Sequence, residues 1–499
     1  MCRAIRGTAA GPVTGSAQAW TRRLRVRGLG PAPDRAASER HGTAARPEVA
    51  AVRRALGPDR RRPWGRINRK WTRPRQHAPA CSVGPAPLSA TGPLRLLSAL
   101  AVVLISLPAC QTVRADLAVE GQEAVAAANA DRPITGAPRP LEAESYDPSA
   151  DSLRFDGERH LRNVRQLTFG GNNAEAYWSP DGERLVFQSD WDAINPQGCD
   201  QQFVMSAARG AGRSGDGAQL VSTGQGRTTC GYFLTDGRVV YASTHAAAPA
   251  CPTTAASQTG RYVWDIFPTY DIYVSGADGA ASDPEVLIGG PGYDAEATVS
   301  PDGRFVVFTS TRSGDLELWR YEVATGDLLQ LTDELGYDGG AFFSPDGSQI
   351  VWRASRPTGA EADAYRALLA RDAVQPGALD LYVADADGQN KRRVTRLPGA
   401  NWAPFFHPSG RKLIFASNHH TLDEGGREFD LFLVDLDGGD LERVTFSGTF
   451  DAFPMFSPDG TRLVFASNRR ADRAPSRDTN VFVADWVETP AEVDRAFGR

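Results

Sequence analysis

The sequence lacks the short motifs by which many soluble enzymes are identified. It contains no Gly-x-Ser-x-Gly nucleophile motif, no His-Glu-x-x-His metal motif and no Walker loop. A standard hydrolase needs such a motif to place its nucleophile or its metal. These absences argue against a standard hydrolase, and we expect no cofactor.

The sequence also lacks an apolar run long enough for a transmembrane helix. The run from Leu96 to Leu107 has 12 residues, whereas about 20 are needed to cross ~30 Å of hydrocarbon. A basic flank precedes this run and Pro108-Ala109-Cys110 follows it, which is the order of a signal peptide. We therefore expect residues 94–110 to direct export, with lipidation of Cys110 or, alternatively, cleavage after Ala115. The expected location is the periplasm or the outer membrane.

The net charge of −5 lacks the basic excess that is typical of a dedicated nucleic-acid-binding protein. This average combines two different parts, because residues 1–95 hold 20 Lys and Arg against 4 Asp and Glu. Residues 1–93, rich in Arg and Pro, are expected to be disordered or to precede the true start. A basic nucleic-acid-binding arm is the alternative. Residues 111–160 have few large apolar side chains, which predicts a flexible tether.

The rest of the chain is rich in turns and repeats one phrase six times. The 50 Gly and 34 Pro residues favour an all-β protein. In the phrase, an apolar residue precedes Ser-Pro-Asp-Gly, and an apolar strand follows, which is the pattern of a β-hairpin. Successive copies lie 44 to 66 residues apart. Intact copies begin at Ser179, Ser300, Ser344 and Ser457, and altered copies at Leu234 and His407.

Each copy is followed by two further apolar segments, so that each repeat predicts four antiparallel strands. Four strands in 40–50 residues form one blade of a β-propeller. The last copy, however, has only three strands, and residues 164–168 before the first copy match the missing fourth. We therefore predict a six-bladed propeller over residues 163–487, with the N-terminal strand closing the last blade, and a tail over 488–499.

The Ser-Pro-Asp-Gly repeats resemble those of exported TolB-like propellers. The resemblance covers residues 163–487 and implies a periplasmic scaffold that binds partner proteins at the cell envelope. Similar propellers also precede the catalytic domain of prolyl-oligopeptidase-like enzymes, but only about 12 residues follow the last blade. A regulatory propeller that acts with a separately encoded peptidase is therefore an alternative.

The repeats place two sets of polar residues at one predicted end of the tunnel. We expect Asp and Arg of these sets to pair between neighbouring blades and to hold the ring together. The functional alternative is a polar tunnel mouth that binds a peptide, a sugar or a cation. The first set, six residues before each motif, is Asn173, Thr228, Asp294, Asp338, Asn401 and Asp451. The second set, after the second strands, is Trp191, His245, Arg312, Arg356, His419 and Arg469.

Two histidines of the second set raise the question of a metal. His245 and His419 belong to blades three apart and are predicted to face each other across the axis, with His420 beside them. Lone histidines are more often hydrogen-bonded parts of the structure than ligands. We therefore expect no metal site, and a site formed by these three side chains is the alternative.

Two insertions and three cysteines belong to the same predicted face. Residues 245–270 are rich in aromatic side chains, which predicts either a partner-binding surface or aromatic residues that pack on each other. Residues 356–380 are predicted to include a short helix over 362–370. In an oxidising compartment one disulfide is expected. The pair is left open among Cys199, Cys230 and Cys251.

These observations predict a non-catalytic, exported and monomeric propeller that binds an envelope protein or peptide, or a glycan, through its loop face. No nucleic acid is expected as a partner. Contact with the membrane is expected only through a lipid anchor. The enzymatic alternative is a lyase or a metal-dependent hydrolase with its site at the tunnel mouth.

Overall fold

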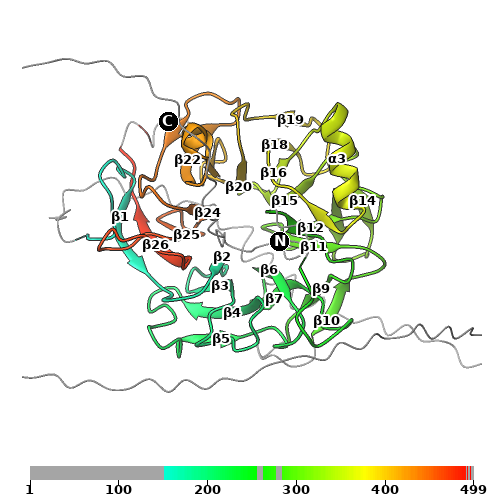
Figure 1. Ribbon diagram of the computed structural model, residues 1–499, viewed down its shortest axis with the longest axis horizontal. Helices are drawn as coiled ribbons and strands as arrows, with labels where there is room; N and C mark the ends of the chain where they lie inside the picture. Colours follow the sequence, from blue (N-terminus) through cyan, green and yellow to red (C-terminus); the bar gives the residue numbers. More distant parts are fainter. Residues whose placement is uncertain (1–150, 255–261, 277–283, 490–491, 493–494, 496–499) are drawn as a thin grey trace, which may run out of the picture. The chain divides into compact units, whose positions relative to one another are not determined.

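A computed structural model describes residues 151–254, 262–276, 284–489, 492 and 495. Six four-stranded antiparallel sheets are arranged around a common axis, which confirms the predicted six-bladed propeller (Figure 1). The segments 1–93 and 94–110, with Cys110, and most of the tether and tail lie outside the described residues. Within the described part, no helix is long and apolar enough to cross a membrane.

The strands of each blade run outward from the axis, with the first strand innermost. Blade one is β2 (Asn173–Trp178), β3 (Arg184–Ser189), β4 (Gln201–Ser206) and β5 (Ala218–Leu220). Blade two is β6 (Thr228–Phe233), β7 (Val239–Ser243), β9 (Asp271–Val274) and β10 (Glu285–Ile288). Blade three is β11 (Asp294–Val299), β12 (Phe305–Ser310), β13 (Glu317–Glu322) and β14 (Leu328–Gln330).

The remaining blades follow the same order. Blade four is β15 (Asp338–Phe343), β16 (Gln349–Ala354), β18 (Asp380–Asp385) and β19 (Arg392–Arg393). Blade five is β20 (Asn401–Phe406), β21 (Lys412–Ser417), β22 (Asp430–Asp435) and β23 (Glu442–Arg443). Blade six is β24 (Asp451–Phe456), β25 (Arg462–Ser467), β26 (Asn480–Trp486) and β1 (Leu161–Gln166).

Blade six combines strands from both ends of the described chain. Strand β1 pairs antiparallel with β26, with Leu161 opposite Trp486 and Gln166 opposite Phe482. The strand starts three residues earlier than the segment 164–168 that the sequence pattern selects. This pairing covers the outer edge of β26, which would otherwise present unpaired backbone groups.

The Ser-Pro-Asp-Gly phrase forms the turn between the first two strands of a blade. In blade one, Ser179 Oγ donates to Asp181 Oδ1 (2.5 Å), and the backbone N–H of Arg184 donates to Ser179 Oγ (2.9 Å). Gly182 has a φ of +71°, a left-handed conformation that favours glycine. The Ser, Asp and Gly positions therefore each have a structural role in the turn.

The core lies between neighbouring blades. The second strand of each blade carries an aromatic side chain at the same position, and all six of these side chains are fully buried. An aromatic residue at this position fills the space that widens outward between two sheets. These residues are Phe187, Tyr241, Phe308, Trp352, Phe415 and Phe465.

The two insertions meet on the face opposite the Ser-Pro-Asp-Gly turns. Helix α3 (Gly359–Leu369) in blade four confirms the predicted short helix, and it buries Ala362 and Tyr365. After it, strand β17 (Ala373–Val374) pairs antiparallel with β8 (Trp264–Asp265) from the blade-two insertion. We call this two-stranded sheet the cap ribbon. A 3-10 helix, η2 (His419–Glu424), follows the second strand of blade five.

One disulfide joins blade one to the blade-two insertion. It links Cys199 and Cys251, and Cys230 is a buried thiol outside the bond. The structure thereby selects one of the pairs that the sequence left open. The bond closes a loop between residues 52 apart in the sequence, which includes the four strands β4, β5, β6 and β7.

Candidate functional site

The polar residues selected from the sequence do not form an open tunnel mouth. Each residue of the first set is the first residue of an innermost strand, and each is at most 2% exposed. These residues are Asn173, Thr228, Asp294, Asp338, Asn401 and Asp451. Since so little of these side chains reaches the solvent, a ligand cannot contact them directly in this structure.

The Asp and Arg residues of the two sets pair within a blade, so the prediction of pairs between neighbouring blades was wrong. The distances are 2.8 Å for Arg312–Asp294 and 2.8 Å for Arg356–Asp338. The reason is local, because each arginine follows the strand that pairs directly with the aspartate's own strand. Burial raises the pKa of Asp338 to about 6, against the opposing hydrogen bonds from Arg356.

Blade six shows the same pairing with a third partner. Arg469 donates to Asp451 (3.1 Å) and also to Glu158 (3.0 Å), which precedes β1. All three side chains are fully buried. The Arg469 guanidinium therefore fixes the segment that leads into β1.

Blades one and five carry an amide in place of the aspartate. Ser189 donates to Asn173 Oδ1 (2.8 Å), and Ser417 donates to Asn401 Oδ1 (2.7 Å). The neutral amide needs no arginine, and the second-set residue of blade one is the buried Trp191. In these blades too, the polar residues stabilise the strand ends.

The histidines do not face each other across the axis. His245 Nδ1 lies 2.8 Å from Ser243 Oγ, and its ring packs on Tyr273 in the third strand of its own blade. His419 likewise bonds Ser417 and packs on Phe432. Burial lowers the pKa of both histidines. Each ring thus points outward to its own blade, which contradicts the predicted placement of the two rings.

The innermost strands share a kink at their third residue. All six of these residues have a φ between +49° and +60°, and the strand register shifts at each of them. Such a bulge turns one side chain out of the ladder. The six residues all line one cavity of about 20 Å³, which we call the waist of the tunnel. They are Glu175, Cys230, Glu296, Gly340, Ala403 and Phe453.

A buried ion pair blocks the waist. The guanidinium of Arg353 donates to Glu296, and the same carboxylate accepts hydrogen bonds from the Tyr337 hydroxyl (2.9 Å) and the Thr309 hydroxyl (2.7 Å). Arg353 and Glu296 are 4% and 3% exposed. These donors satisfy the carboxylate, so the ion pair offers no uncompensated charge. The pair also fills the waist, where the remaining cavity is only about 20 Å³.

The cap ribbon covers the waist from the face opposite the Ser-Pro-Asp-Gly turns, which we call the loop face. Trp264 on β8 packs against Tyr337 and Trp402, and the Arg353 guanidinium lies 5.2 Å from its ring centre. Trp264 and Tyr270 are buried, and Tyr262 is 47% exposed. The aromatic side chains of this insertion therefore mainly pack on the propeller, and they do not form the broad partner-binding surface that was one expectation.

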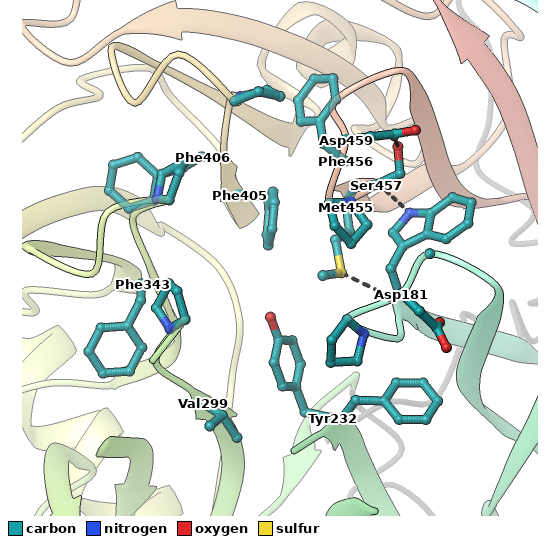
Figure 2. A pocket seen from close by; sticks show the side chains of 18 of the residues that line it. Asp181, Tyr232, Val299, Phe343, Phe405, Phe406, Met455, Phe456, Ser457 and Asp459 are labelled. Carbon is teal, nitrogen blue, oxygen red and sulfur yellow. Dashed lines mark hydrogen bonds between the residues drawn. The ribbon is translucent and has the colours of Figure 1, made fainter. Parts of the chain in front are cut away.

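The face with the Ser-Pro-Asp-Gly turns carries a wide apolar depression of about 560 Å³, which we call the bowl (Figure 2). Its wall is built from the residue that directly precedes each of the six motifs, together with the prolines of the turns. Figure 2 shows Tyr232, Phe405 and Met455 pointing into its centre. The wall residues are Trp178, Phe233, Val299, Phe343, Phe406 and Phe456.

An aromatic cluster closes the bottom of the bowl. Tyr177 contacts Tyr232 with ring centres 5.6 Å apart, and Phe342 contacts both Tyr177 (5.5 Å) and Phe405 (5.3 Å). Tyr177 and Phe342 come from blades three apart, so their contact spans the axis. The bowl is therefore a closed depression and not the entrance to an open tunnel.

The charged groups around the bowl are already engaged. Asp181 and Asp459 accept hydrogen bonds from the serine of their own turns, each at 2.5 Å. Arg462 donates to the carbonyl of Gly182, and its guanidinium lies 4.4 Å from the Trp178 ring centre. The bowl can therefore hold an apolar group between aromatic walls, but it presents no poised acid and base.

The bowl could have been found from the apolar residues of the sequence, not from the polar ones. Each of the six motifs is preceded by an apolar side chain, aromatic in five of the six, at a turn that would otherwise be exposed. Six-fold repetition of an apolar residue beside a turn indicates a shared apolar surface around the axis.

Comparisons with known proteins agree with the fold. Residues 369–474 match the family model of the TolB beta propeller domain, so the repeats in this segment are similar to those of that domain. TolB from Acinetobacter baumannii is 16% identical, with a TM-score of 0.39, over 63% of this chain and 63% of that protein. No curated protein matches the sequence.

Enzymes are also among the solved structures that are similar to this chain. An oligogalacturonate lyase in complex with manganese is 14% identical, with a TM-score of 0.41, over 68% of this chain and 96% of the lyase. A gluconolactonase from Xanthomonas campestris is 13% identical, with a TM-score of 0.41, over 66% of this chain and 91% of the enzyme. At these identities and TM-scores, none of the three structures assigns an activity to this chain.

Proposed function

We propose that this protein is an exported, non-catalytic propeller that binds an apolar peptide segment of a partner protein at the cell envelope. The observation that carries the proposal is the bowl, a closed depression of about 560 Å³ with aromatic walls. The proposed surface is the turn face, not the loop face expected from the sequence. The signal-peptide pattern over residues 94–110 supports export.

The size and lining of the bowl suit one or two large side chains of a peptide. Burial of one Leu or Phe side chain contributes about 1.5–3 kcal/mol, and aromatic partners add to this when they meet edge to face. The rim of polar turns would satisfy the backbone of an extended segment. A small anionic substrate would gain little here, because the carboxylates of Asp181 and Asp459 stand at the rim.

A variant pair tests this proposal. Phe405 is a half-buried residue of the bowl, so Phe405→Asp places a charge in the apolar centre. Val286 on β10 is 61% exposed and lies outside the bowl, so Val286→Asp is the matched control. Thr235→Glu is a second bowl variant. It adds a charge at a rim side chain that is already partly exposed.

The readout is capture of partner proteins from an envelope extract by each purified variant. We expect a protein that the wild type and Val286→Asp retain and that both bowl variants lose, with all four proteins melting cooperatively. Equal retention by wild type and both folded bowl variants would contradict the proposal.

A further inference from the structure

The first residue of the third strand is paired with an arginine in blades four and five. In blade four, Arg393 on β19 donates to Asp380 on β18 (2.5 Å). In blade five, Arg443 on β23 donates to Asp430 on β22 (2.5 Å). Each guanidinium also donates to the carbonyl of the threonine two residues later. The carboxylate and the arginine thus form one repeated unit.

Blade three has the acid but lacks the arginine. Glu317 begins β13, and Gln330 on β14 has the register of the arginines, since it lies opposite Trp319 as Arg393 lies opposite Tyr382. The Gln330 amide donates to the carbonyl of Thr332 (2.8 Å), so it takes the place of the guanidinium without its charge. Glu317 is 3% exposed, and its Oε2 atom has no hydrogen-bond partner among the described residues.

Blade six shows that a glutamine at this position can accompany a neutral partner. Gln166 on β1 donates to the carbonyl of Thr168 (2.8 Å), as Gln330 does in its blade. The first residue of the third strand there is Asn480, which carries no charge. Charged and neutral residues are therefore matched in blades four, five and six, and blade three alone of these four combines an acid with a glutamine.

A cavity of about 440 Å³ lies in front of the unmatched acid. Its wall includes Glu317, Gln330, Asp315 and Asp333, and helix α3 adds Tyr365 and Arg366. Asp315 accepts hydrogen bonds from the Tyr365 hydroxyl and from backbone N–H groups, whereas Asp333 is mostly exposed and pairs with Lys391. Glu317, whose buried Oε2 has no donor among the described residues, thus lines a space that is large enough for a ligand.

We propose that this cavity binds an organic cation, a guanidinium or a primary ammonium, whose charged group pairs with Glu317 in the position that arginine takes in blades four and five. A guanidinium suits the site because it donates to a carboxylate and a carbonyl at once, as Arg393 and Arg443 do. The described residues around Glu317 do not form a metal-like cluster, because the only group of three with ligand atoms within 4.8 Å of one another is His160, Glu442 and Glu492.

The charges around Glu317 make the binding depend on pH. Burial, with help from the nearby Asp338 and Asp315, raises the pKa of Glu317 to about 8, while Thr332 and Arg356 act in the opposite direction. From α3 the facing groups are Tyr365 and the exposed Arg366, which pairs with Asp363. A bound cation favours the ionised carboxylate, so binding strengthens as the pH rises from 6 to 8 and a proton is released.

The test is isothermal titration of the full chain with agmatine, which carries both a guanidinium and an ammonium group. We expect saturable binding to the wild type that is at least tenfold weaker in Glu317→Gln and in Gln330→Arg. The glutamine removes the charge at nearly constant shape, and the new arginine occupies the site from within. The neutral analogue n-butylurea, which lacks both charged groups, is expected not to bind. A parallel titration with the peptide acetyl-Gly-Arg-Gly-amide, which has no free amine, shows whether the guanidinium alone binds, as it would in an arginine side chain of a protein.

Thermal melting of variants at Gln330 and Gln166 gives an independent test. Gln330→Arg is expected to raise the melting temperature, because it completes the unit found in blades four and five. Gln166→Arg, placed opposite the neutral Asn480, is the matched control and is expected not to raise it. Agmatine binding that is unchanged in folded Glu317→Gln, or no binding to the folded wild type, would overturn the proposal.

Discussion

The guanidinium of Arg353 on β16 donates to the carboxylate of Glu296 on β11, so that an ion pair joins blades four and three at the waist of the tunnel. The sequence predicted ion pairs between neighbouring blades, but among a different set of residues. The residues selected from the sequence stand at the starts of the innermost strands, where they pair within their own blade. Glu296 instead stands at a bulge, which turns its side chain into the tunnel.

Loss of the waist ion pair should strongly destabilise the fold. Glu296→Gln leaves the Arg353 guanidinium buried without its counter-charge, which costs about 3–5 kcal/mol. Urea unfolding measures the change. The surface pair of Arg304 and Glu322 supplies the control, since Glu322→Gln should change the free energy of unfolding by less than about 1 kcal/mol. Similar losses in both variants would contradict the structural role of the waist pair.

The disulfide should contribute to stability through the unfolded chain. A bond between residues 52 apart restricts a long loop, which the loop-entropy relation values at about 4 kcal/mol. We expect Cys199→Ser/Cys251→Ser to unfold at lower denaturant concentration by that free energy. Reducing agent should lower the stability of the wild type but not of the double variant. A wild type that is insensitive to reduction after unfolding and refolding would argue against the bond.

Glu317 should make stability fall as the pH rises. Its pKa in the folded protein is raised to about 8 by burial, above the ordinary value of 4.5. Between these two values the folded state holds a proton that the unfolded state has released, so stability decreases from pH 5 to pH 8. Glu317→Gln removes this contribution. Its melting temperature should therefore exceed that of the wild type by more at pH 8 than at pH 5, and an equal difference at both pH values would contradict the assignment.

Much of the fold could be predicted because its determinants are local. The Ser-Pro-Asp-Gly turn is defined by hydrogen bonds within six residues, such as those of Ser179, Asp181 and Arg184. The same hydrogen bonds recur in blades three, four and six, and the altered copies in blades two and five keep the spacing, so the number of blades can be counted from the sequence. The helix at Gly359–Leu369 is likewise predictable from a short local pattern.

The site could not be predicted in the same way, because it depends on contacts between distant segments. The cap ribbon forms from Trp264 and Val374, which are far apart in the sequence and both lie in irregular insertions. Polar residues at repeated positions suggest a binding site, but His245 and Asp294 form hydrogen bonds within their own blades. Each apolar residue next to a turn resembles an ordinary core residue, and only the six-fold repetition indicates the shared surface that closure of the ring forms.

Photo-crosslinking shows whether the bowl holds a partner protein in the cell. A benzophenone amino acid at Thr235, on the bowl rim, is activated in intact cells, with the same group at the exposed Val286 as the control. We expect an adduct with one protein from Thr235 only, joined at a segment with a large apolar side chain. Adducts that form equally from both positions, or none from Thr235 while the protein is folded and exported, would contradict this expectation.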